Sequence, residues 1–150
     1  MKQIAYKVVK VIDGKLYSCN VPVPVRVEYK EGEVVTAELG PLMCFDERRH
    51  AELFLENLIY EDVSAGADFA YALYEAEIER WTNTKACYRI ATVSTLTREA
   101  VKSFWEDPRE YPVEDRALLI ICTVLASSTI LQKRLDFREY IQERDGAYAI

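Results

Sequence analysis

The chain of 150 residues has the length of one domain, and half of its residues are hydrophobic, which is ordinary for a globular protein. Its formal net charge of −6 repels phosphate backbones and disfavours general nucleic-acid binding. The longest apolar run, at 117–126, is about half of the roughly 18 residues that a membrane span needs, and the first residues lack the apolar stretch of a signal peptide. We therefore expect a cytoplasmic protein without membrane contact, located in the host cytoplasm if it is viral.

The first two apolar segments predict a β-hairpin. The segment AYKVVKVI at 5–12 is rich in β-branched residues, and KLYSC at 15–19 follows after Asp13-Gly14. An Asp-Gly pair is preferred between two strands because both turn positions need a positive φ.

The segment VPVPVRVEY at 21–29 alternates with a period of two, which predicts an extended chain with one buried face. Pro22 and Pro24 cannot donate a ladder hydrogen bond, so we expect this half at a sheet edge or outside the sheet. A turn at 30–33 then leads into the strand-like segment VVTAEL at 34–39.

The segment GPLMCFDERRH at 40–50 contains the only histidine of the chain, His50. LMCF predicts a short strand, and Asp46 is a suitable N-cap for a following helix whose apolar stripe runs from Ala51 to Leu58. We favour the interpretation that His50 is a partly exposed side chain near a helix start. The alternative is a reactive site that pairs it with Cys44.

Three glutamates, Glu75, Glu77 and Glu79, alternate with apolar residues in the segment FAYALYEAEIERW at 69–81. A strand places all three on one face, where they could hold a magnesium or calcium ion or supply a general acid and base. We favour the alternative, a solvent-exposed face of an antiparallel sheet, because the opposite face is apolar. These glutamates and His50 are the candidate catalytic residues, and we predict no metal ligand and no cofactor-binding residue.

The remaining segments complete a single α+β domain over residues 1–150, with a mostly antiparallel sheet and about three helices. The segment at 113–126 is consistent with either a helix or a buried strand, because periodicity does not separate the two in so short an apolar run. The other expected elements are a strand at 86–94, a helix at 98–107 capped by Thr97, a strand at 127–135 and a helix at 136–144 capped by Asp136.

The four cysteines are isolated in the sequence, with no CxxC pair: Cys19, Cys44, Cys87 and Cys122. We interpret them as small buried apolar residues, because structural zinc sites usually contain at least one short spacing. A disulfide is the alternative. The chain has few asparagines and glutamines beside many glutamates, a bias of proteins from hot environments, where intracellular disulfides occur.

The order of segments resembles a small uncharacterised domain of phage, viral and archaeal proteins. The matching pieces are YKVVK with DGKLYS, VEYKEGEVV, GPLMCFDERRHAELF, ALYEAEIE and TVLASSTILQKRL. The same order is similar to the ADP-ribosyltransferase core, in which a glycine-led strand and helix precede a strand like ALYEAEIE. Within that strand, Glu75-Ala76-Glu77 resembles the paired-glutamate motif of some members, although it comes earlier in the chain than that motif does.

The enzymatic form of that core needs residues that this chain lacks at the matching positions. The first strand has Lys7 and Lys10 where a histidine or arginine would grip NAD. Phe45 stands near the expected tyrosine, and Thr129 or Gln132 near the catalytic glutamate. The resemblance therefore implies a related fold whose NAD chemistry is lost.

No common nucleotide-binding or catalytic motif occurs, neither GxGxxG nor a P-loop nor GxSxG. We therefore predict a non-enzymatic interaction or accessory module of viral or archaeal origin, which acts with a protein partner or as a homo-oligomer and needs no cofactor. The alternative is a carboxylate-dependent enzyme, either a degenerate ADP-ribosyltransferase-like protein or a metal-dependent hydrolase.

Overall fold

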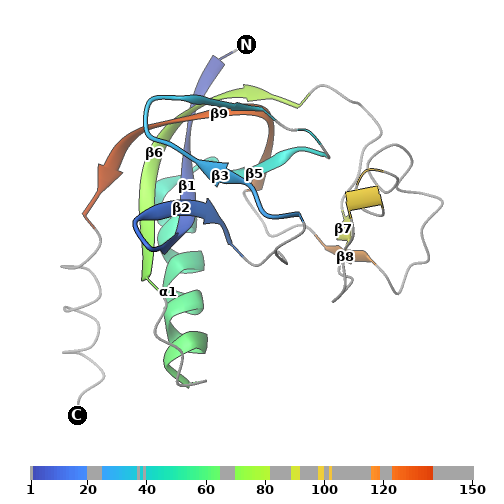
Figure 1. Cartoon of the computed structure of the whole chain (residues 1–150). Helices are drawn as coiled ribbons and strands as arrows, with labels where there is room; N and C mark the ends of the chain where they lie inside the picture. Colours follow the sequence, from blue (N-terminus) through green and yellow to red (C-terminus); the bar gives the residue numbers. More distant parts are fainter. Residues whose placement is uncertain are drawn as a thin grey trace.

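A computed structural model describes residues 2–19, 25–36, 38, 40–64, 70–81, 89–91, 98–99, 102, 116–118 and 123–136. Seven strands form one sheet with antiparallel pairings, and two more form a separate two-stranded sheet beside it (Figure 1). The elements of the described residues are β1 (Lys2–Ile12), β2 (Lys15–Ser18), β3 (Glu28–Tyr29), β4 (Val34–Thr36), β5 (Leu42–Phe45), α1 (Arg48–Ser64), β6 (Ala70–Arg80), β7 (Arg89–Ala91), β8 (Arg116–Leu118) and β9 (Thr123–Leu135).

Four strands of the large sheet close into a small barrel. β1 pairs with β6 from Lys2, opposite Glu79, to Val11, opposite Ala70. β6 pairs with β9, β9 pairs with β5, and β5 returns to β1, which completes the ring. The hairpin strand β2 and then β3 extend from β1, and β4 extends from β9.

The local turn chemistry confirms the predicted hairpin. β1 and β2 pair on either side of Asp13 and Gly14, whose φ angles are 50° and 76°. The predicted turn at 30–33 is also confirmed, with Gly32 at φ 76°. Of the segment 21–29, β3 is the described strand and lies at an edge of the sheet, whereas Pro22 and Pro24 lie outside the described residues.

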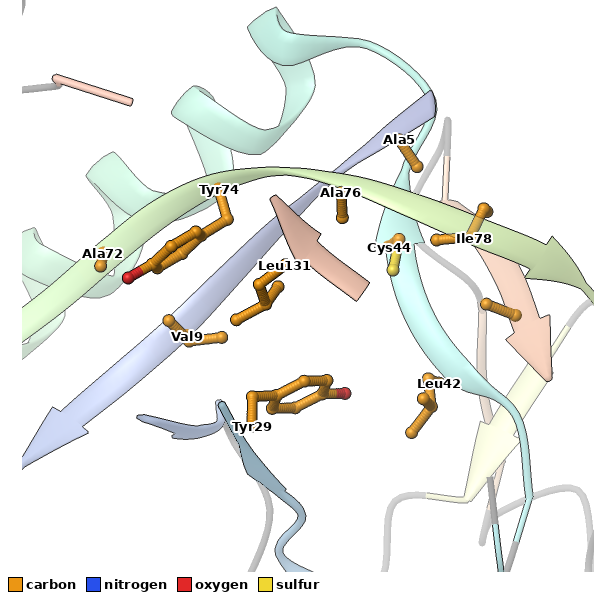
Figure 2. Packing of buried hydrophobic residues seen from close by; sticks show 11 residues of the cluster. Ala5, Val9, Tyr29, Leu42, Cys44, Ala72, Tyr74, Ala76, Ile78 and Leu131 are labelled. Carbon is orange, nitrogen blue, oxygen red and sulfur yellow. The ribbon is translucent and has the colours of Figure 1, made fainter. Parts of the chain in front are cut away.

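The two faces of the barrel wall carry separate cores. The interior cluster fills the inside of the ring, where the labelled side chains of Figure 2 point toward one another. The helix-side cluster lies between the outer face and α1. The buried members of the interior cluster are Ala5, Val9, Tyr29, Leu42, Cys44, Ala72, Tyr74, Ala76, Ile78, Ala126 and Leu131, and those of the helix-side cluster are Val8, Phe45, Ala51, Leu55, Leu58 and Leu73.

Helix α1 has the predicted apolar stripe but a different cap. Ala51, Leu55 and Leu58 are buried against the barrel, which confirms the stripe. The predicted N-cap is wrong by one residue, because the helix starts at Arg48 and the carbonyl of Glu47 accepts the first amide hydrogen bonds. Asp46 and Glu47 both lie between the end of β5 and the start of α1, and the packing of α1 on the barrel decides which of them takes the cap position.

The prediction of about three helices is not supported, since α1 is the one helix among the described residues. Of the expected helix at 98–107, residues 98–99 and 102 are described and are helical, whereas the expected helix at 136–144 lies outside the described residues except for Asp136. The ambiguous segment 113–126 is strand wherever it is described, in β8 and at the start of β9, because its residues pair with neighbouring strands. The strand predicted at 127–135 is confirmed as part of β9, and the described part of 86–94 contains β7.

Candidate functional site

His50 and Cys44 lie on opposite sides of the barrel wall. Cys44 belongs to the interior cluster and is 0% exposed, whereas α1 carries His50 on the outer face. The Nδ1 atom of His50 lies 3.3 Å from Oε2 of Glu47, without the geometry of a hydrogen bond. The sheet between the imidazole and the thiol means that these two residues do not form a nucleophile and base pair.

The glutamate row lies on the outer face of β6, as the strand periodicity predicts. The three glutamates are half-buried and lie on the same face of β6 as Leu73, which α1 covers. The residues between them, Ala76 and Ile78, face the interior cluster. Glu77 forms an ion pair with Lys2 at 3.3 Å and accepts a hydrogen bond from Gln132 at 3.4 Å. Glu75 lies opposite Lys133 in the register of β9. Basic and amide side chains thus surround this row.

No group of three histidine, cysteine or acidic side chains is arranged to hold a metal ion in the described ranges. The alternative of a carboxylate-dependent enzyme built on Glu75 and Glu77 stays a prediction. Cys19 and Cys44 form no disulfide with a described residue, and Cys87 and Cys122 lie outside the described residues. No helix in the described part of the chain is both long and apolar enough to cross a bilayer.

A groove of about 500 Å³ opens where the tip of the β1–β2 hairpin and the turn after β3 face β6 and β9. This volume is within the roughly 300–1,000 Å³ of typical ligand pockets. The groove was not predicted from the sequence, because its walls come from segments that are far apart in the chain. Its lining residues are Val11, Gly14, Lys15, Leu16, Glu28, Tyr29, Lys30, Glu31, Tyr74 and Arg134.

The floor and the rim of the groove differ in chemistry. Apolar and aromatic side chains from β1, β2, β3 and β6 form the floor. Lys15, Lys30 and Arg134 are exposed at the rim, and none of them forms an ion pair with a described carboxylate. Three positive charges therefore meet around one hollow in a chain whose net charge is −6.

One of the two carboxylates in the groove is already engaged. The hydroxyl of Tyr74 donates a short hydrogen bond to Oε1 of Glu31. Burial, together with this carboxylate, raises the pKa of Tyr74 to about 12, so the hydroxyl keeps its proton at neutral pH. The other carboxylate, that of Glu28, is exposed at the rim.

A second polar cluster lies inside the barrel, around Lys7. Lys7 is 6% exposed, and its ammonium donates a hydrogen bond of 2.6 Å to the carbonyl oxygen of Met43. The same nitrogen lies 5.2 Å from the centroid of the Tyr29 ring. The hydroxyl of Tyr29 is buried without a hydrogen-bond partner among the described residues. The thiol of Cys44 lies 3.8 Å from the hydroxyl of Thr129.

The protonation states of this cluster leave one positive charge in the interior. Burial lowers the pKa of Lys7, but the charges that Tyr29, Cys44 and Cys19 carry when they are ionised raise it by more, so it lies above its ordinary value of 10.5. Burial also raises the pKa of the Tyr29 hydroxyl and of the Cys44 thiol. At neutral pH the ammonium is therefore charged, and no described carboxylate lies within ion-pair distance of it.

The interior position of Lys7 was not predicted from the sequence. Residues with odd numbers in β1 face the interior, where Ala5 and Val9 are fully buried, while Val8 packs under α1. Because both faces of this strand are apolar, the alternation does not show which lysine is buried. The closure of the ring decides it, because the pairing of β1 with both β5 and β6 turns the odd-numbered face inward while α1 covers the other face.

The residues at the positions where the ADP-ribosyltransferase core has its functional side chains do not meet in the groove. Lys7 and Thr129 are buried in the barrel, and Gln132 is exposed beside Glu77. The sequence matches no protein-family model and no curated protein, and the structure matches no solved structure. The resemblance stays a prediction.

Proposed function

We propose that the protein is a non-enzymatic interaction module that holds an extended, acidic segment of a partner protein in the groove. The observation that carries this proposal is the set of three rim cations without ion-pair partners among the described residues, around an apolar floor. A segment that alternates acidic and apolar side chains would satisfy both parts of the groove.

Charge complementarity supports an acidic occupant. Arg134 offers the planar fork that binds a carboxylate through two parallel hydrogen bonds, and Lys15 and Lys30 add two flexible ammonium groups. The chain as a whole has a net charge of −6 and does not attract an acidic segment at long range, so the three rim cations supply the local attraction. The groove thus gives the segment a defined place to bind.

The neighbouring strand supports an extended conformation of the occupant. Among the described strands, β3 pairs only with β2, through Leu16 opposite Tyr29 and Tyr17 opposite Glu28. The outer edge of a strand can pair with the backbone of an added segment, while alternate side chains of that segment enter the adjacent groove. This mode uses backbone hydrogen bonds for affinity and the rim charges for selection.

Fluorescence anisotropy with two synthetic peptides tests the proposal. One peptide alternates glutamate with valine, and the other has lysine in place of glutamate. We expect binding of the first alone, with an affinity that falls as salt is added. The double substitution Lys15→Gln/Arg134→Gln should weaken binding roughly tenfold.

Lys133→Gln is the matched control, because Lys133 and Arg134 are neighbours on opposite faces of β9 and each substitution removes one positive charge. Equal binding of both peptides, or an equal effect of Lys133→Gln and Arg134→Gln, would refute an acidic partner at this groove. A homodimer that Arg134→Gln dissociates would make a second copy the occupant. Binding of inorganic phosphate in place of the peptide would indicate a site for small anions.

A further inference from the structure

Each of the four strand pairings that close the barrel is here called a joint, and the one between β1 and β5 is much shorter than the others. β5 pairs with β9 over four positions, from Leu42 opposite Ala126 to Phe45 opposite Thr123. β5 pairs with β1 at a single position, Tyr6 opposite Phe45. A strand joint with one bridge has few backbone hydrogen bonds, so it opens more easily than a long ladder.

A buried side chain crosses this joint beside the bridge. Lys7 follows Tyr6 in β1, and its ammonium bonds the carbonyl of Met43, two residues before Phe45 in β5. The same ammonium lies against the ring of Tyr29 in β3. One side chain therefore connects β1 to β5 and to β3 where backbone pairing is minimal.

We propose that Lys7 is the latch of the barrel: its ammonium holds β5 against β1, and the barrel opens at this joint into a continuous sheet when the bond to Met43 breaks. No strand is lost in this opening, because β5 stays paired with β9, β9 with β6 and β6 with β1. The proposal does not depend on any ligand of the groove.

Opening of this joint has a chemical reporter in the native chain. Cys44 lies in β5 between Met43 and Phe45, its side chain is 0% exposed, and its thiol is free. A thiol reagent reaches it only after the interior has been exposed. Alkylation of Cys44 by iodoacetamide, resolved by peptide mass spectrometry, thus measures how often the joint opens.

The first experiment uses the unmodified chain in increasing, sub-denaturing urea. We expect the alkylation rate of Cys44 to depend less on urea than the hydrogen exchange of the Ile78 amide, because a local opening exposes less surface than global unfolding. Ile78 lies in β6 between two long ladders and reports the global event. The same urea dependence at both sites would show that Cys44 is reached only by global unfolding, and the latch would be refuted.

The second experiment compares Lys7→Met with Lys133→Met, which removes an exposed lysine of β9. Methionine fills a similar volume but cannot bond the carbonyl of Met43, so Cys44 alkylation should become roughly tenfold faster. The exchange of the Ile78 amide should stay unchanged or slow down, since an apolar side chain replaces a buried charge. An unchanged alkylation rate of Cys44 in Lys7→Met would contradict the proposal, as would an equal acceleration of Cys44 alkylation and of Ile78 exchange. If Lys7→Met does not fold, the urea comparison is the deciding test.

Discussion

The strand β1 forms two joints in the barrel, and a different lysine belongs to each. Along β6 the ladder runs from Lys2 to Val11, and the exposed Lys2 forms an ion pair with Glu77 on the outer face. Along β5 there is one bridge, and the buried Lys7 bonds a backbone carbonyl in the interior. The first joint consists mainly of backbone hydrogen bonds, whereas the second relies on side chains.

This difference shows how the same residue type has unequal importance within one strand. An exposed ion pair in water contributes roughly 0–1 kcal/mol, because solvent screens it and both side chains lose entropy. A buried ammonium bonded to a carbonyl has no water to replace a lost partner. Substitutions at the short joint should therefore have larger effects than substitutions at the long one.

The largest expected effect is at the bridge itself. Phe45 is 7% exposed, and its ring packs on that of Phe54 with centroids 5.2 Å apart. Phe45→Ala leaves a cavity at the joint and should lower the free energy of unfolding by about 3–5 kcal/mol, measured by urea denaturation. Val34→Ala, at a position that is 61% exposed, is the control and should stay within about 0.5 kcal/mol. A loss below ~1 kcal/mol at Phe45 would mean that the short joint does not limit stability.

Alkaline pH should weaken the interior around the short joint. Cys44, Tyr29 and Lys7 all have a pKa above the ordinary values of 9.0, 10.0 and 10.5, so the folded state keeps protons that the unfolded state loses. The contribution of these groups to the free energy of unfolding is therefore fully present below about pH 9. It decreases as the pH rises, by up to roughly 1.4 kcal/mol per pH unit for each retained proton.

Urea midpoints at pH 7, 9 and 10.5 measure this dependence. In the variant Cys44→Ala, the free energy of unfolding should begin to fall only near pH 10, where Tyr29 titrates in the unfolded chain. A midpoint that does not change up to pH 10.5 would show that these three groups titrate alike in both states, which contradicts their burial.

The smallest effect is expected at the long joint. Lys2→Ala removes the ion pair with Glu77, whose lysine side chain is 70% exposed, and should cost at most about 1 kcal/mol. The alkylation rate of Cys44 should not change, since β6 remains paired along the backbone. A loss as large as that of Phe45→Ala would remove the distinction between the two joints.

Local patterns made much of the strand order predictable. The Asp13-Gly14 turn, the strand at 42–45 and the alternation in β6 follow from neighbouring residues, and the structure has all three. The exact helix start was less predictable, because Asp46 and Glu47 are both acceptable near the cap and packing decides between them. The short apolar run at 117–126 suits either a helix or a strand until its pairing partners are known.

The candidate sites were less predictable than the elements. His50 and the glutamate row attracted attention because their residue types are chemically versatile, yet they lie on the outer faces of the barrel. The groove combines residues from five strands and their turns, from Val11 to Arg134, and no local pattern brings them together. Lys7 has the same appearance in the sequence as Lys10, its neighbour on the other face of β1.

The sequence by itself determined which segments other than 117–126 are extended, where the chain turns, which face of β6 is apolar and that α1 carries one buried stripe. These properties depend on side chains that are near one another in the chain, so periodicity and turn chemistry are sufficient. Only the tertiary structure decided that four strands close into a ring, that Lys7 lies inside it and that three cations meet at one groove. Closure depends on pairings between distant segments, and both faces of β1 are apolar, so the inward face is chosen only when β5, β6 and α1 pack against it.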